Sequence, residues 1–337
     1  MLGALLGACG GGSDEAEPGS AAATPEAVAS SPQALAPVQP RRALSYKRKG
    51  VIAIAVARDG KAIGVADSGG GVRMLDASGA HETRVLKAPG GAVAAGLIFS
   101  ADGRYLVTVG RDSVAQVWST ATGERRLTLR GHEHPLRAVA ASADGSIIAT
   151  GGEETRVMLW DGTTGRLKRV LRGSTDFVNC LSVSPDGRLL ASGGADARIL
   201  VWDIATGTLL HTLRGHANEV NAVAFGADGK LLASAGEDGK VLLWDPAAGR
   251  QLQALEGQHA PVRSLAFNQG GGLLTAGAMD GKVVVWDMTT RKVSQEFVAS
   301  ASAVNAVAFS GSSSNQLFVG NEERRILSLN VLRSTAR

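Results

Sequence analysis

Short apolar segments alternate with polar turns along most of the chain, and the stretch from Ser184 to His216 shows the pattern most completely. It reads SPDGRLLASGGADARILVWDIATGTLLHTLRGH, with an Asp-Gly turn, an apolar segment, a second tight turn, the run ILVW, a Thr-Gly turn and a last apolar segment. Asp-Gly favours tight turns because glycine adopts positive φ freely and aspartate bonds to the nearby backbone. The pattern predicts four short antiparallel strands in one small sheet.

The same pattern recurs at a fixed interval. The chain has five tryptophans, each 42 residues after the one before, at Trp118, Trp160, Trp202, Trp244 and Trp286. A period of this length is typical of repeat architectures, in which each small sheet buries its faces against its neighbours. Two degenerate repeats extend the series. Leu75 lies 43 residues before the first tryptophan, and Ser328 lies 42 residues after the last one. We therefore expect seven sheets.

The residues around the tryptophans carry a resemblance to a known family. They read VWST, LWDG, VWDI, LWDP and VWDM, and Gly-His pairs occur at Gly131-His132 and Gly215-His216. These motifs resemble the WD40 family of β-propellers, and the resemblance covers roughly residues 40 to 330. It implies an all-β fold, a seven-bladed WD40 β-propeller, over residues 41–337.

The phase of the repeats predicts how the ring closes. Leu213 lies 15 residues before the turn aspartate Asp228, and the same step back from Asp59 reaches Leu44. The chain runs only nine residues past Ser328, which leaves no outer strand for the last blade. We therefore expect an N-terminal strand, at about residues 41–46, to complete the last blade and remove the open sheet edges.

The resemblance also implies buried tetrads of His, Ser or Thr, an acid and Trp in the blades. The matching sets are His132, Thr150, Glu154 and Trp160, and His216, Ser234, Asp238 and Trp244. Asp112, Asp196, Asp280 and Glu322 hold the acid position in other blades. A Ser-His-Asp trio also suits a hydrolase, but this one recurs at the repeat period and no G-x-S-x-G motif accompanies it. We expect hydrogen bonding and no catalytic residue, so the protein is predicted not to be an enzyme.

Neither a metal nor a cofactor is expected. His132 and His134 form one alternating pair without the third and fourth ligands of a zinc site. The Gly-Lys pairs lack the Ser or Thr that follows lysine in a P-loop, and they are interpreted as hairpin turns.

Polar residues near the start of the first strands predict a binding surface. Arg137, Asn179, Asn221, Arg263 and Asn305 share one phase of the repeat, and Arg111, Glu153, Glu237 and Asn321 precede the acid position in their blades. In WD40 propellers both positions open on the top face around the central channel. The resemblance therefore implies a polar rim that reads a protein partner, with a merely hydrated channel mouth as the alternative.

The N-terminus resembles the lipobox of bacterial lipoproteins. The run LGALLGAC ends at Cys9, which would carry the lipid, and residues 1–9 are interpreted as the remnant of such a signal. Only eight residues precede Cys9 and none is basic, so a start upstream of Met1 is expected. Residues 10–40 hold five of the ten prolines and no aromatic residue, and we expect a disordered tether. The alternative is a chance cysteine in a flexible terminus.

The charge and the hydropathy of the chain limit the classes of partner that we expect it to bind. The 35 basic and 31 acidic residues are interspersed, so the net charge of +4 does not indicate a nucleic-acid-binding face. No run of 18 apolar residues occurs, so membrane contact is expected through the lipid on Cys9 and not through a span.

These observations predict a monomeric, non-enzymatic scaffold for protein-protein interaction, held at the bacterial cell envelope. The alternatives are a cytoplasmic WD40 adaptor and, as a different class, a small-ligand-binding or enzymatic propeller that uses the central channel.

Overall fold

The computed structural model describes residues 42–45, 50–79, 81–86, 94–311, 315–323 and 325–331, and of residues 42–45 only the backbone. The regular elements in this part of the chain are β-strands, and they form seven four-stranded antiparallel sheets. An all-β, seven-bladed propeller is therefore confirmed. The boundaries predicted at residues 9 and 40, and Cys9 itself, lie outside the described residues.

The blades are numbered along the chain. Blade one is β2 (Val51–Val56), β3 (Ala62–Asp67), β4 (Val72–Asp76) and β5 (Glu82–Leu86). Blade two is β6 (Ala94–Phe99), β7 (Tyr105–Gly110), β8 (Ala115–Ser119) and β9 (Arg125–Leu129). Blade three is β10 (Leu136–Ala141), β11 (Ile147–Gly152), β12 (Glu154–Asp161) and β13 (Leu167–Arg172). Blade four is β14 (Val178–Val183), β15 (Leu189–Gly194), β16 (Arg198–Asp203) and β17 (Leu209–Arg214).

Blade five is β18 (Val220–Phe225), β19 (Leu232–Gly236), β20 (Val241–Asp245) and β21 (Arg250–Leu255). Blade six is β22 (Val262–Phe267), β23 (Leu273–Ala278), β24 (Lys282–Asp287) and β25 (Lys292–Val298). Blade seven is β26 (Val304–Phe309), β27 (Gln316–Asn321), β28 (Arg325–Asn330) and, as its outer strand, β1 (Arg42–Ser45).

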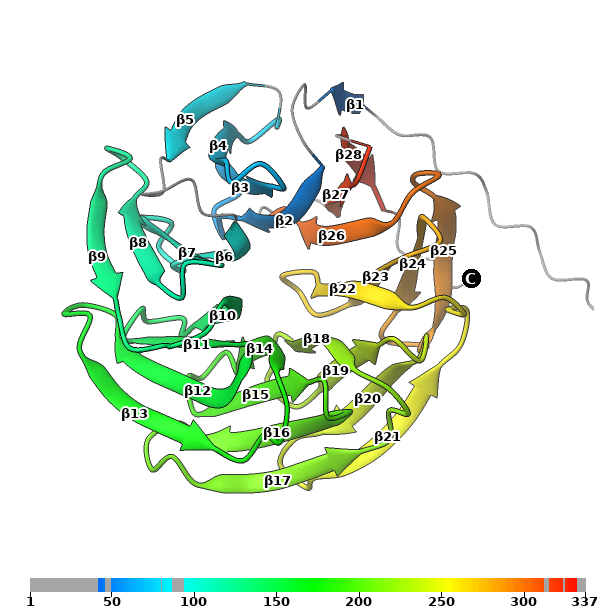
Figure 1. The fold of residues 1–337 in the computed structure, drawn as a ribbon. Coiled ribbons are helices and arrows are strands. Elements are labelled where there is room, and N and C mark those ends of the chain that lie inside the picture. The colour runs from blue at the N-terminus through cyan, green and yellow to red at the C-terminus, as the bar shows by residue number, and fades with distance from the viewer. Residues whose placement is uncertain are drawn as a thin grey trace, which may run out of the picture. The chain divides into compact units, whose positions relative to one another are not determined.

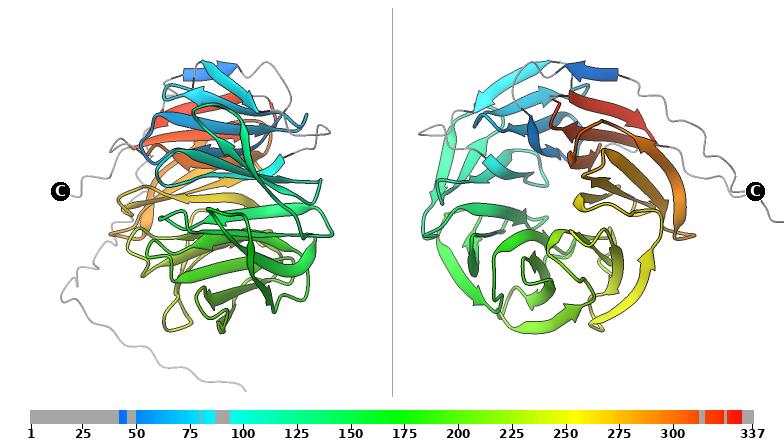
Figure 2. Two further views of the ribbon diagram at one scale, coloured as in Figure 1. Left: turned by 90° about the vertical axis from the view of Figure 1, so that its left-hand side faces the viewer. Right: turned by 45° about the vertical axis from the view of Figure 1, so that its right-hand side comes forward.

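Within the unit of residues 35–337, the first strand of each blade lies nearest the centre (Figure 1). Neighbouring first strands contact each other around the ring, including β2 of blade one and β26 of blade seven. Two further views show the sheets following one another around the same centre (Figure 2). The seven blades therefore form a closed ring.

The apolar core lies between the blades. The five tryptophans on the third strands are at most 4% exposed. One buried cluster joins Leu243 of blade five to Leu274, Trp286 and Met288 of blade six. Because each sheet has two apolar faces, it is covered only when a blade stands on either side of it.

The ring closes as the phase of the repeats predicts. β1 pairs antiparallel with β28, and Leu44 stands opposite Ile326. The other blades show the same pairing, for example Leu213 opposite Ile199 in blade four. An N-terminal strand therefore completes the C-terminal blade and covers its edge.

Blade seven departs from the predicted register by one residue. In blade six Leu274 stands opposite Trp286, and in blade seven Leu317 stands opposite Leu329. Leu329, and not Ser328, therefore holds the tryptophan position, so that assignment from the 42-residue step was wrong.

The cause is a longer turn. The turn in blade six is closed by a hydrogen bond from the N–H of Asn268 to the carbonyl oxygen of Leu273, five residues on. The equivalent hydrogen bond in blade seven runs from the N–H of Ser310 to the carbonyl oxygen of Gln316, six residues on. One extra residue between β26 and β27 moves every later position by one.

Candidate functional site

A β-bulge occurs near the start of the first strand in each blade. In β10, Leu136 pairs with Gly152 and Ala138 pairs with Gly151, so Arg137 between them has no paired residue. The same interruption falls at the equivalent residue of every blade. These seven residues are Ile52, Ala95, Arg137, Asn179, Asn221, Arg263 and Asn305.

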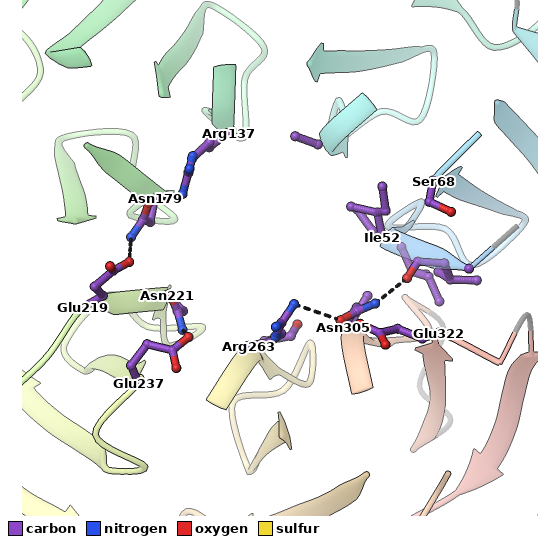
Figure 3. A pocket seen from close by; sticks show the side chains of 17 residues that line it. Ile52, Ser68, Arg137, Asn179, Glu219, Asn221, Glu237, Arg263, Asn305 and Glu322 are labelled. Carbon is purple, nitrogen blue, oxygen red and sulfur yellow. Dashed lines mark hydrogen bonds between the residues drawn. The ribbon is translucent and has the colours of Figure 1, made fainter. Parts of the chain in front are cut away.

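The bulges aim these seven side chains at the centre of the ring. A bulged residue leaves the ladder and its side chain is redirected, and all seven line one central cavity of about 790 Å³ (Figure 3). We call this ring of seven bulged residues, with the neighbouring cavity-lining residues Ser68, Glu219, Glu237 and Glu322, the rim.

In blades three and five a glycine of the second strand packs closely against the backbone just before the bulge. A Cβ on Gly152 would lie 2.1 Å from the carbonyl oxygen of Pro135, and one on Gly236 would lie 2.2 Å from that of Glu219. Neither position tolerates a side chain without a backbone shift. The bulge itself does not require glycine, because Asp67, Ala278 and Asn321 hold the equivalent position in blades one, six and seven.

The extra residue in blade seven changes two predicted positions. The carboxylate of Glu323 accepts a hydrogen bond from the N–H of Ala301 at 3.1 Å, as Asp238 does from Ala217 at 3.0 Å. Glu323, and not Glu322, therefore holds the acid position of this blade. Asn321, predicted for the rim, is fully buried, and Glu322 lines the cavity in its place.

Six of the eight residues predicted for partner binding line the cavity, namely Arg137, Asn179, Asn221, Glu237, Arg263 and Asn305. Glu153 does not line it but contacts Arg137, and Arg111 is exposed and does not line it either. Glu219, one residue before Val220, also lines the cavity and was not predicted, although its place next to a first strand is visible in the sequence.

Arg137 is held by three neighbours. Its Nε and Nη2 donate to Oε1 of Glu153 at 3.2 and 3.0 Å, and its Nη1 donates to Oδ1 of Asn179 at 3.2 Å. The guanidinium carbon lies 5.2 Å from the ring centre of Phe177, a cation-π contact. The arginine is therefore preorganised, although 41% of its side chain is exposed.

Two asparagines tie their blade to the next one. Nδ2 of Asn221 donates to Oε1 of Glu237 at 2.8 Å in its own blade and to the carbonyl oxygen of Val262 at 3.0 Å in blade six. Nδ2 of Asn305 donates to the carbonyl oxygen of Val51 at 2.8 Å, which joins blade seven to blade one. These amides hold adjacent first strands together at the rim (Figure 3).

The remaining polar contacts complete the network. Nδ2 of Asn179 donates to Oε2 of Glu219 at 3.2 Å, and Nη1 of Arg263 donates to Oδ1 of Asn305 at 3.4 Å. The rim therefore presents two arginines and three glutamates from blades three, five, six and seven. Blade one contributes Ile52 and Ser68 and blade two contributes Ala95, so the rim has a charged and polar arc and a largely apolar one.

The polar sets predicted as tetrads meet in the interior. His132 Nε2 lies 2.7 Å from Thr150 Oγ1, which also accepts a hydrogen bond from Trp160 Nε1 at 2.7 Å, and His132 Nδ1 contacts Glu154. Burial lowers the pKa of His132. The histidine is 8% exposed and serves as a hydrogen-bond relay between blade elements.

The second set repeats this arrangement in blade five. His216 Nε2 lies 2.8 Å from Ser234 Oγ, Trp244 Nε1 donates to the same oxygen at 2.8 Å, and His216 Nδ1 lies 3.0 Å from Asp238. Burial lowers the pKa of His216 as well. The Ser-His-Asp contacts thus belong to a tryptophan-anchored network inside a blade and do not face the cavity.

Cys180 is buried in β14 as a free thiol, and burial raises its pKa to about 12. In the part of the chain that the structure describes, no group of three or more His, Cys, Asp or Glu side chains is arranged to hold a metal ion. No helix among the described residues is long and apolar enough to cross a membrane.

A comparison with protein-family models finds the WD domain, G-beta repeat. The matched stretches are residues 81–119, 123–161, 165–203, 207–245 and 249–287, which together make up more than half of the chain. Each stretch covers the fourth strand of one blade and the first three strands of the next. A search of curated proteins found no match.

Proposed function

Because this chain belongs to the WD40 family, whose propellers commonly bind protein partners and are generally not enzymes, we propose that it is a non-enzymatic scaffold that docks a protein partner at the rim. The partner would present a polar segment to blades three to seven. The largely apolar arc of blades one and two would receive a non-polar part of the same segment.

The observation that carries this proposal is the convergence of bulged residues on one cavity. Five of the seven bulged positions carry arginine or asparagine, and three glutamates stand beside them. Arginine combines a fixed charge with five donors and is enriched among residues that dominate binding energy. Several of these groups are already held in place, so a partner would meet side chains that lose little conformational freedom on binding.

Site-specific photocrosslinking tests the location. A photoreactive amino acid at Ala95, on the rim, should capture the partner in cells, whereas the same group at Arg250 should not. Arg250 begins the outer strand β21 and its side chain is 68% exposed. Capture at Arg250 alone would refute docking at the rim.

With the partner identified, calorimetry tests the residues. Replacing Arg137 and Arg263 together by alanine should weaken binding by about 1–3 kcal/mol for each side chain that anchors the partner. The Arg250→Ala variant is the matched control, because it removes an exposed arginine from the side of a blade. Equal affinity of the double variant and the wild type would contradict the proposal.

We propose further that the propeller is tethered to the bacterial cell envelope by a lipid on Cys9. Its support is the sequence alone, the apolar run LGALLGAC followed by the proline-rich residues 10–40. A gene that encodes a complete lipoprotein signal ahead of Cys9 should give a protein that incorporates palmitate and fractionates with membranes, and Cys9→Ser should abolish both. Unchanged fractionation of that variant would favour a cytoplasmic adaptor.

A further inference from the structure

A second pocket lies between blades two and three, away from the rim. Its lining includes Tyr105, Val107 and Val117 of blade two and Ala141, Ile148 and Gly162 of blade three, and its volume is about 270 Å³. Arg137 stands near the start of β10 and Ala141 ends it. Four residues of extended strand separate them, about 13 Å, so the pocket opens near the opposite end of the first strands.

Ala141 is the smallest residue at its position in the repeat. It stands opposite Ile148, and the equivalent pairs in blades two, five, six and seven place phenylalanine opposite leucine. Those phenylalanines are Phe99, Phe225, Phe267 and Phe309, and the other two blades carry Val56 and Val183. Blade three therefore lacks an aromatic ring that four other blades have.

Gly162 is the smallest residue at a second position. Its N–H donates to the carbonyl oxygen of Ser146, and the same bond runs from Ile204 to Arg188 and from Met288 to Gly272. The side chains of Ile204 and Met288 are buried against the preceding blade. Blade three offers no side chain at this place.

The junction between blades five and six also carries a pocket, of about 490 Å³, beside Phe267 and Met288, but this pocket is not lined by Leu243 or Leu274 beneath them. There Phe267 and Met288 pack with Leu231 and Leu243 of the preceding blade in one apolar cluster. Val117 and Ile148, the counterparts of Leu243 and Leu274, do line the pocket between blades two and three, so this pocket reaches the depth that Phe267 and Met288 cover in the other junction.

The mouth of the pocket offers an aromatic face. The guanidinium carbon of Arg126 lies 4.5 Å from the ring centre of Tyr105, and both residues line the pocket. Aromatic rings prefer to pack at the edge or offset face of another ring. A volume of about 270 Å³ is below the usual range for small-molecule sites and suits one large side chain.

From these observations we propose that the pocket between blades two and three binds an aromatic side chain of a protein partner. The ring enters where Phe267 stands in the junction of blades five and six, with Tyr105 and Arg126 at the entrance. The proposal is independent of docking at the rim, and either can fail without the other.

The test uses the N-acetyl amides of phenylalanine, tryptophan and leucine as probes, followed by NMR titration of the whole protein. The two aromatic amides should perturb the resonances of Tyr105 and Ile148 and bind with dissociation constants on the order of millimolar. The leucine amide should bind at least several-fold more weakly. Perturbation by none of the amides, or equal binding of leucine, would overturn the proposal.

Substitutions then test where the aromatic side chain of the probe binds. Ala141→Phe should abolish binding, because it inserts the phenyl ring of the other blades. Position 162 is unsuitable for filling, since a Cβ on Gly162 would lie 2.0 Å from the carbonyl oxygen of Gly145. Arg126→Ala should weaken binding and Lys168→Ala, its counterpart in the next blade, should not. Unchanged binding in both Ala141→Phe and Arg126→Ala would refute the assignment.

Discussion

Removal of β1 tests how much the closing strand contributes to stability. Deleting residues 1–48 removes the strand Arg42–Ser45, whereas deleting residues 1–38 keeps it. β1 pairs with β28 over four residues. About four inter-strand hydrogen bonds, each contributing about 0.5–1.5 kcal/mol, predict a loss of roughly 2–6 kcal/mol. Since 1 kcal/mol corresponds to about 2–4 °C in a large domain, Tm should fall by at least several degrees.

Differential scanning calorimetry of the two truncated proteins at equal concentration measures the difference, and light scattering during the scan reports aggregation. The longer truncation should also aggregate earlier, because β28 would present an unpaired edge. The 1–38 deletion is the matched control, since it shortens the N-terminus and keeps every residue of β1. Equal Tm values for the two proteins would refute the contribution of β1 to closure.

Three further predictions concern the interior of the ring. Asn305→Ala removes the hydrogen bond to Val51 and should lower the free energy of unfolding by about 1 kcal/mol in urea titration; an unchanged midpoint would show that this tie contributes nothing. Burial lowers the pKa of His132 and His216 from the ordinary 6.5, so protons bind more readily to the unfolded chain. The free energy of unfolding should therefore keep its full value above pH 6.5 and fall as the pH decreases toward the lower folded-state pKa. Replacing both histidines by glutamine should flatten this pH profile in urea unfolding. Burial raises the pKa of Cys180 to about 12, so iodoacetamide should alkylate Cys180 far more slowly in the folded protein than in the urea-unfolded one, as mass spectrometry of the Cys180 peptide will show; equal rates would contradict a buried thiol.

The repeat architecture could be predicted from sequence because its signals are local. Tight turns at Asp-Gly pairs, apolar third strands and tryptophans spaced by 42 residues each depend on a few neighbouring residues. Even the closing strand followed from phase, since Leu44 occupies the place that Leu213 holds in blade four.

The register of blade seven could not be predicted in this way. This repeat has no tryptophan, and its Ser-rich turn hides one extra residue. Only the pairing of Leu317 with Leu329 shows the shift, and with it the exchange of Asn321 for Glu322 at the rim. Register in a strand is set by its partner strand, so a degenerate repeat is assigned reliably only after the sheet has formed.

The sequence by itself determined that seven similar sheets form one ring and that Arg137, Asn179, Asn221, Arg263 and Asn305 share one position in it. Only the tertiary structure decided what those residues contact. Asn305 bonds to Val51 across 254 positions of the chain, and the space beside Ala141 exists because blade two faces a blade that lacks the usual phenylalanine. Strand and turn formation depends on adjacent residues, whereas hydrogen-bond partners and cavities depend on which blades the closed ring places side by side.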